Sequence, residues 1–376
     1  MSEFQHYEWQ TIDRQLTNSE RKAVRELSSH IEVSPGRAVV SYSWGDFKHD
    51  PLQVLVRYFD AYLYQTNWGS RRLVFRFPTG ALESAAIKPY CIKYMISFKS
   101  LAEYDILDID LGDHESNGRV DEEGQLSYLV GLRNDIMQGD YRSLYLAWMK
   151  GVSLICNDEE SGREFKSSKL DIPPVPPGLR ELSSTLEQFT EAFDISDTLI
   201  EAVAEYSPEL AEIPETDYLS LVAQLSREQC NELLSRLAQG DSTVVVEVKK
   251  LLQSLMPSAP TLSSTHLSPL ELLKREKTVR EERQQRKAEE LRRKHEAEMK
   301  NLIGKERKIW QQIAALVAVK KFKQYDEAVE LLVKLSQLAD YTQTKVKYRQ
   351  QLDELREQYK RLLSFQDRLE RAGLLD

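Results

Sequence analysis

The sequence contains few of the residues that build covalent frameworks or membrane spans. Its 376 residues include three cysteines, Cys91, Cys156 and Cys230, which are far apart. This spacing excludes a dense disulfide framework and is typical of a reducing compartment, so we expect a cytoplasmic location. The longest apolar helix pattern is interrupted by Lys150, and the first residues have neither a basic region nor an apolar core. We therefore expect neither a membrane span nor a signal peptide.

The motifs of common enzyme and cofactor sites are also missing. We find no phosphate-binding P-loop, no dinucleotide glycine fingerprint, no nucleophile elbow and no paired histidines at metal-ligand spacing. The six histidines are scattered along the chain. These absences favour a protein that is not an enzyme. We assign no cofactor, no metal site and no catalytic residue, although folding can bring distant catalytic groups together.

Charge is plentiful and unevenly distributed. The formal net charge is −9, but residues 269–376 carry 26 Lys plus Arg against 19 Asp plus Glu, a net of +7. The first 268 residues carry 25 against 41, a net of −16. We therefore expect the two parts to attract each other, or the C-terminal part to prefer a more acidic partner.

The N-terminal part combines strand and helix patterns. Residues 38–44 alternate between two faces, which predicts a half-buried strand. Asp50 and the proline after it mark a helix start, and apolar spacing predicts that this helix continues to Leu63. We expect Gly69 to end the helix in a left-handed turn, and alternation over residues 71–77 predicts the next strand.

Further patterns complete this first domain. Alternation predicts strands over residues 92–98 and 107–111, and an apolar stripe over residues 141–156 predicts a helix packed on the sheet. The predicted fold class is α+β, with an N-terminal mixed sheet, packed helices and ferredoxin-like elements over residues 1–170.

Composition then marks the later boundaries. Four prolines predict a semi-rigid linker over residues 171–178, although such a segment could also bind an aromatic groove. Helical patterns predict a bundle over residues 179–256, and a stretch rich in Pro, Ser and Thr predicts a second linker over residues 257–268.

A charged helix should follow over residues 269–308. Between Leu273 and Ala288 the only apolar residue is Val279, too few for a coiled-coil seam. Acidic residues precede basic residues by four positions repeatedly, and each such pair contributes about 0.2–0.5 kcal/mol to a helix. The pattern predicts a solvated helical rod, followed by a C-terminal helical module over residues 309–376.

Several motifs resemble those of known families. The first half of the chain resembles an uncharacterised family of bacterial proteins in the segments 7–14, 44–48 (Trp-Gly-Asp-Phe-Lys), 67–69 (Asn-Trp-Gly), 144–148 and 173–179. This resemblance implies no particular activity. The tail over residues 325–374 is similar to the tails of bacterial SWIM-type zinc-finger proteins, but it lacks their Cys/His cluster, so the resemblance implies no zinc site here.

Two groups of residues are candidates for function. A polar loop where the strand meets the helix contains Asp46, Lys48 and His49, and Arg71 could join it. The simpler interpretation, which we favour, is that Asp50 caps the helix and the loop residues are solvated. The candidate partner-binding residues are Arg286, Arg292, Arg293, Lys294, Trp310 and Tyr325.

These observations favour a cytoplasmic interaction or adaptor protein that docks a protein partner through the rod and the terminal module. The basic residues could instead follow the phosphates of a nucleic acid, but the interleaved glutamates favour a solvated face. Trp310 could anchor a partner, although we favour a place in the core of the terminal helices. An unrecognised enzyme with its site in the N-terminal domain is the second alternative. The sequence indicates neither an oligomeric state nor the identity of a partner.

Overall fold

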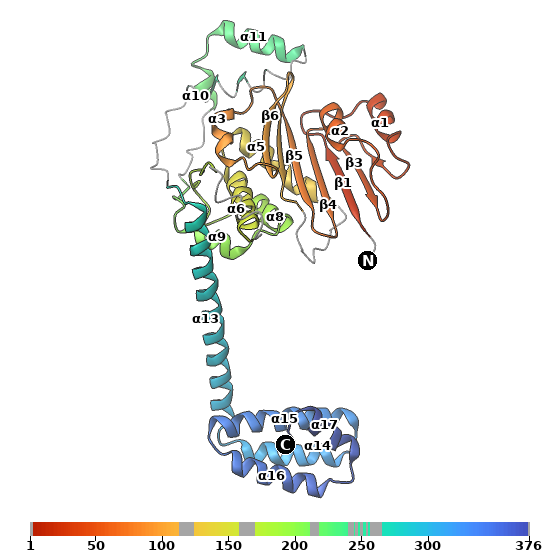
Figure 1. The fold of residues 1–376 in the computed structure, drawn as a ribbon, viewed down its shortest axis with the longest axis vertical. Helices are drawn as coiled ribbons and strands as arrows, with labels where there is room; N and C mark the ends of the chain where they lie inside the picture. Colours follow the sequence, from red (N-terminus) through yellow and green to blue (C-terminus); the bar gives the residue numbers. More distant parts are fainter. Residues whose placement is uncertain are drawn as a thin grey trace. The chain divides into compact units, whose positions relative to one another are not determined.

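The structure is a computed structural model, and it describes residues 3–112, 124–157, 170–210, 218–239 and 265–374, together with residues 244, 247, 248, 251, 252 and 255. The chain forms two compact units, Met1–Arg280 and Glu281–Asp376. Elements of both units are labelled in Figure 1.

The first unit is built on a seven-stranded sheet in the order β2-β3-β1-β4-β5-β7-β6, and all neighbouring strands are antiparallel. The strands are β1 Gln5–Gln10, β2 Glu32–Val33, β3 Arg37–Tyr42, β4 Ala61–Thr66, β5 Arg71–Pro78, β6 Ile96–Ser100 and β7 Tyr104–Asp110. The predicted α+β class is confirmed. The sheet is antiparallel rather than mixed, because short hairpins join β4 to β5 and β6 to β7, whereas parallel neighbours need long crossovers. Strands β3 and β4 flank β1, both run antiparallel to it, and are connected through α2 (Pro51–Tyr58), which is the split βαβ connection of ferredoxin-like folds.

Helices cover both faces of this sheet (Figure 1). The described helices of the first unit are α1 Asn18–Arg25, α2 Pro51–Tyr58, α3 Ser84–Ile87, η1 Lys88–Tyr90, α4 Gln125–Leu129, α5 Gly131–Met137, α6 Arg142–Asn157, α8 Ser184–Ala192, α9 Asp197–Ala204, α10 Tyr218–Val222 and α11 Arg227–Ala238. Trp9 and Phe59 belong to the core on the α1 and α2 side. Phe75 and Trp148 belong to the core on the side of α6 and α8, which confirms the predicted helix over residues 141–156.

The helix predicted to continue to Leu63 is shorter. It ends at Tyr58, and residues 61–66 form the central strand β4. Tyr62 and Leu63 are adjacent yet 2% and 0% exposed, because each faces a different covered side of the sheet. A strand buried on both faces has no clean alternation, so its apolar run resembles a helix pattern. Gly69, with a φ of +111°, lies in the turn between β4 and β5.

Two predicted strands also begin or end differently. The strand predicted over residues 38–44 is β3, which ends at Tyr42, and Trp44 lies beyond it with 73% of its surface exposed. The strand predicted over residues 92–98 begins only at Ile96. Tyr94 interrupts it with a left-handed φ of +69° and is 86% exposed, so its side chain does not pack on the sheet.

The proline-rich segment 171–178 is not a linker. Val175 is 4% exposed within the same core as the sheet, and its N–H donates to the Thr265 carbonyl at 2.9 Å. Pro174 forms an isolated antiparallel bridge with His266, residues 177–178 form a turn, and the apolar residues between and after the prolines are buried. Helices α8 and α9 add Leu186 and Leu199 to this core, so they are not a separate bundle. Most of the predicted linker over residues 257–268 lies outside the described residues.

Helix α13, Pro269–Leu302, corresponds to the predicted rod and is 34 residues long. At 1.5 Å per residue it extends about 50 Å. Its first turns are not solvated, since Leu272 belongs to the core of the first unit, Val279 is 2% exposed and the buried carboxylate of Glu276 accepts a hydrogen bond from Thr198. Residues 281–298 are exposed or partly exposed. The helix ends before residue 308 because Gly304 takes a left-handed φ of +81°.

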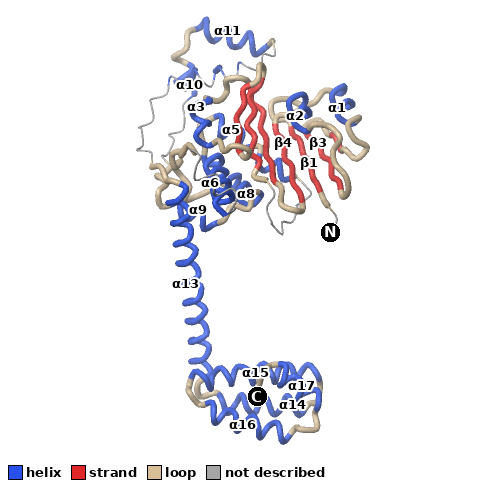
Figure 2. Tube along the Cα trace, viewed as in Figure 1, coloured by secondary structure: helices blue, strands red, loops and turns tan. Residues whose placement is uncertain are grey.

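The described part of the second unit contains helices and loops (Figure 2). After α13 come α14 Glu306–Ala318, α15 Phe322–Tyr341, α16 Lys345–Gln358 and α17 Leu363–Arg371. Helix α15 packs against the other three, because its apolar residues cover a wide stripe. They share one core with Met299 of α13.

Candidate functional site

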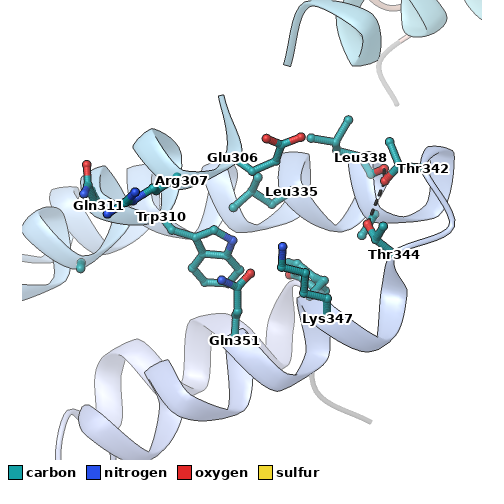
Figure 3. A pocket seen from close by; sticks show the side chains of 13 residues that line it. Glu306, Arg307, Trp310, Gln311, Leu335, Leu338, Thr342, Thr344, Lys347 and Gln351 are labelled. Carbon is teal, nitrogen blue, oxygen red and sulfur yellow. Dashed lines mark hydrogen bonds between the residues drawn. The ribbon is translucent and has the colours of Figure 1, made fainter. Parts of the chain in front are cut away.

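The second unit contains a groove of about 770 Å³ bounded by α14, α15 and α16 (Figure 3). Its floor belongs to α15, which packs against both other helices. The floor and walls are formed by Leu335, Leu338, Ala339, Trp310, Gln311, Ala314, Tyr348 and Gln351, and polar residues at its margin are Glu306, Arg307, Thr342, Thr344 and Lys347. The groove therefore combines an apolar interior with a polar rim.

The turn between α15 and α16 sets one end of the groove. Gln343 takes a left-handed φ of +57°, and the Thr344 N–H donates to the Ala339 carbonyl at 2.8 Å. This is the hydrogen bond of a Schellman helix end, which reverses the chain within a few residues. The hydroxyls of Thr342 and Thr344 are 2.8 Å apart (Figure 3). Helix α16 consequently begins beside the end of α15 and carries Lys347 to the groove.

Trp310 and Tyr348 form the aromatic part of the groove. Their ring centroids are 5.9 Å apart and their planes are tilted by 42°. Tyr348 is 8% exposed and its hydroxyl donates to the Leu332 carbonyl at 3.0 Å. Burial raises the pKa of Tyr348 to about 12, so the hydroxyl stays protonated and held at neutral pH. Trp310 is half-buried, so one part of its indole is accessible from the groove.

Several hydrogen-bond donors of the groove lining have no partner among the described residues. Figure 3 shows the indole of Trp310 and the side chains of Lys347 and Gln351 pointing toward one another between the helices. Among the residues that the structure describes, none accepts a hydrogen bond from the Trp310 indole, the Lys347 ammonium or the Arg307 guanidinium. Glu306 is the one acidic residue of the lining, and its carboxylate accepts the Gly304 N–H at 3.0 Å.

Tyr325, predicted as a partner-binding residue, is part of the core. It is 4% exposed, and its ring centroid lies 5.6 Å from that of Phe365. The apolar spacing of α15 turns this side chain toward α17. A partner cannot contact it without unfolding the helix pair, so this assignment is corrected.

The basic residues predicted on the rod are exposed and paired with glutamates. Arg293 lies 2.7 Å from Glu289, Lys294 lies 2.6 Å from Glu290, and Arg292 lies 3.4 Å from Glu296. Arg286 is exposed on the same helix. None of the four basic residues lines the groove. Exposed pairs of this kind contribute up to about 1 kcal/mol each and reduce the charge available to phosphates.

The predicted polar loop does not form a shared site with Arg71. Asp46 accepts a hydrogen bond from the Gln5 side chain at 2.6 Å, whereas Lys48 and His49 are exposed. Arg71 is 9% exposed and donates to the carbonyls of Thr66 and Ser70 at 2.7 and 2.9 Å, which closes the β4–β5 turn. Burial lowers the pKa of Arg71.

The predicted helix cap beside this loop is confirmed. Asp50 accepts the Leu52 N–H at 2.8 Å, as an N-cap does. A second cavity of the first unit, about 750 Å³ along β6, is lined by other residues and contains neither Asp46 nor Arg71.

Sequence reasoning missed a buried charge network in the first unit. Asp60 is 1% exposed, and its carboxylate lies 2.6 Å from the Arg76 guanidinium. The Arg133 guanidinium donates two hydrogen bonds to the Asp13 carboxylate, at 2.9 and 2.7 Å. Arg133 also donates to the Arg76 carbonyl at 2.7 Å, which joins the two pairs. Its members are far apart in the sequence, so no local pattern signals it.

A second polar cluster crosses strands β1 and β3. The His6 ring nitrogen Nδ1 lies 2.9 Å from the Ser41 hydroxyl, and Nε2 lies 3.9 Å from the carboxylate of Glu8. That carboxylate is fully buried and bonds to Arg37 at 2.6 Å and to the Leu126 N–H at 3.3 Å. The same residue types occur in hydrolytic triads, but here the acid is paired with an arginine rather than aligned with the histidine.

Within the described ranges, no three His, Cys, Asp or Glu side chains lie close enough to hold a metal ion. Among the helices of those ranges, none combines the length and the apolar character needed to cross a membrane.

Comparison of the chain with protein-family models, with curated proteins and with solved structures gave no match. The resemblances to a bacterial family and to SWIM-type tails therefore stay predictions, and the groove must be interpreted from its own chemistry.

Proposed function

We propose that this protein is a non-enzymatic interaction or adaptor protein that docks a segment of a protein partner in the groove of the second unit. The observation that carries the proposal is the half-buried Trp310 in a groove of about 770 Å³ with an apolar floor. Tryptophan is enriched among the residues that dominate binding energy at protein interfaces.

The dimensions and lining support a docking role. Binding sites for compact ligands and anchors measure roughly 300–1,000 Å³ and combine apolar walls with a few polar groups. Grooves between helices accept the apolar face of an incoming helix or an extended segment. The groove has both features, and its aromatic wall is held in place by the Tyr348 hydrogen bond.

We propose the cytoplasm as its location. Within the described residues, none of the three cysteines forms a disulfide. Free cysteines are typical of proteins in a reducing compartment.

A variant that fills the groove tests the docking role. Ala314 lines the groove, whereas the next residue, Ala315, is exposed outside it. We expect the full-length Ala314→Arg protein to recover at least tenfold less of the partners that wild type retains from native cells. The charge-matched Ala315→Arg protein should recover the same partners as wild type. Quantitative mass spectrometry of affinity-purified material measures both, and circular dichroism checks the fold.

Equal recovery of the same partners by both variants would show that the groove is not the docking site. If Ala314→Arg does not fold, the Gln351→Glu variant takes its place in the test. Gln351 is a half-buried residue of the lining, and its change to Glu adds less bulk than the change of Ala314 to Arg.

A further inference from the structure

The groove presents more hydrogen-bond donors than acceptors. The Trp310 indole N–H and the Lys347 ammonium, together with the Arg307 guanidinium, have no acceptor among the described residues. The lining offers a single carboxylate, that of Glu306, and the Gly304 N–H already binds it at 3.0 Å. Lysine and arginine side chains only donate hydrogen bonds, and so does an indole. Lys347 and Arg307 are exposed, so water accepts their hydrogen bonds in the free protein, and a ligand that displaces this water must bring acceptors.

From this imbalance we infer that the docked segment carries an acidic side chain, Asp or Glu, close to an aliphatic or aromatic side chain. The carboxylate binds between Lys347 and the Trp310 indole N–H, and the apolar side chain packs on the half-buried Trp310 ring and Ala314, because Leu335 and Leu338 are only 3% and 2% exposed. This inference rests on the proposed docking function, and it specifies the class of segment that the groove accepts.

The charges of the lining favour one carboxylate over a polyanion. Lys347 and Arg307 oppose Glu306, which leaves one net positive charge in the lining. Lys345, at the start of α16, is paired with Asp340 at 2.7 Å and adds little. A carboxylate accepts hydrogen bonds without offering any, and charged donors bind it more strongly than neutral donors do. The apolar floor would leave a phosphate backbone without contacts over most of the groove.

Peptide selection tests this inference on the full-length protein. A library of random 12-residue peptides, fused to a phage coat protein through their C-termini, is panned against wild type. We expect enriched peptides to contain Asp or Glu within four positions of Leu, Ile, Phe, Trp or Tyr. C-terminal fusion leaves no free terminal carboxylate, so acidic side chains must supply the acceptor.

Synthetic, C-terminally amidated copies of the enriched peptides supply the affinities. Fluorescence anisotropy should show at least tenfold weaker binding to Lys347→Glu than to wild type. Arg361 is exposed outside the groove and has no partner among the described residues, so binding to Arg361→Glu should stay within about twofold of wild type.

Several results would overturn the inference. Enriched peptides without acidic residues, equal affinity for wild type and Lys347→Glu, or loss of binding on amidation would each contradict it. If enriched peptides without acidic residues bind wild type but not Ala314→Arg, the docking function survives and only the acidic preference fails. If no peptide binds and Ala314→Arg keeps all native partners, the proposed function fails as well.

Discussion

Asp60 holds together three segments that are distant in the sequence. Its carboxylate accepts the backbone N–H groups of Ile12 and Asp13 at 2.6 and 3.0 Å and pairs with Arg76 at 2.6 Å. Arg76 in turn donates to the Val56 carbonyl at 2.7 Å. One buried charge pair therefore ties the segment after β1 to α2 and β5.

Removal of the Asp60 carboxylate should lower the stability of the first unit. In Asp60→Ala the guanidinium of Arg76 stays buried without its counterion, and breaking such a pair typically costs about 3–5 kcal/mol. We expect a loss of that size in the free energy of unfolding of the first unit, measured by urea denaturation. Glu103→Gln, at an exposed position, should change it by less than about 0.5 kcal/mol. A loss below about 1 kcal/mol in Asp60→Ala would contradict the buried network.

The same carboxylate predicts a pH dependence. Burial by itself would raise the pKa of Asp60, but the Ile12 N–H, the Arg76 hydrogen bond and the Arg76 charge together lower it. Because the folded pKa lies below that of an unfolded aspartate, about 3.9, the stabilisation is fully present above that pH. It is lost as the pH falls from about 4 through the lowered pKa. Urea titrations from pH 7 to pH 3 should give a shallower acid decline for Asp60→Asn than for wild type, and parallel curves would count against this role.

At the scale of single elements, α13 has two different environments. Its start is capped reciprocally by Ser268 and Glu271, and the following turns bury Leu272 and Val279. The later turns are held by pairs such as Glu289–Arg293 and carry exposed residues, for example Leu291, 67% exposed. Packing of apolar side chains therefore stabilises the first turns of α13, and ion pairs between residues four positions apart stabilise the later turns.

Two alanine substitutions separate these environments. Val279→Ala should lower the free energy of unfolding by about 2 kcal/mol, because it removes two buried methyl groups and leaves a small cavity. Leu291→Ala should change it by less than about 0.5 kcal/mol, since the side chain is exposed and alanine favours helices. Chemical denaturation followed by circular dichroism measures both. Equal effects would mean that α13 is uniformly packed or uniformly solvated.

At the scale of the whole molecule, the two units have separate cores. Two cores cover the two faces of the sheet in the first unit, and a third joins α14, α15, α16 and α17 in the second. Units with separate cores can unfold separately. The groove therefore depends on the stability of the second unit.

A core substitution in each unit tests this independence. Leu332, fully buried in the second unit, should cost about 2–5 kcal/mol when changed to Ala. We expect hydrogen exchange measured by mass spectrometry to rise in residues 306–371 and to stay unchanged in the sheet. Asp60→Ala should produce the converse. A change of exchange in both units from either substitution would show that they unfold together.

The groove depends on contacts that no local sequence pattern indicates. Trp310 was a candidate because of its residue type, and it does line the groove. Lys347 and Gln351 had no such signal, because they become its neighbours only when α16 folds back along α15. Tyr325 has the same kind of signal as Trp310, yet the helix phase buries it. Residue type alone does not distinguish an anchor from a core side chain.

Local sequence patterns predict the α+β class, the Asp50 cap, the helix over residues 141–156 and the charged character of α13. Each of these features depends on residues within a few positions of one another, so the sequence alone contains its physical cause. The central strand β4, the burial of the proline-rich segment, the Asp60 network and the groove depend on packing between distant segments. Their formation is a matter of which faces become covered and which charges become paired, and those contacts exist only in the folded protein.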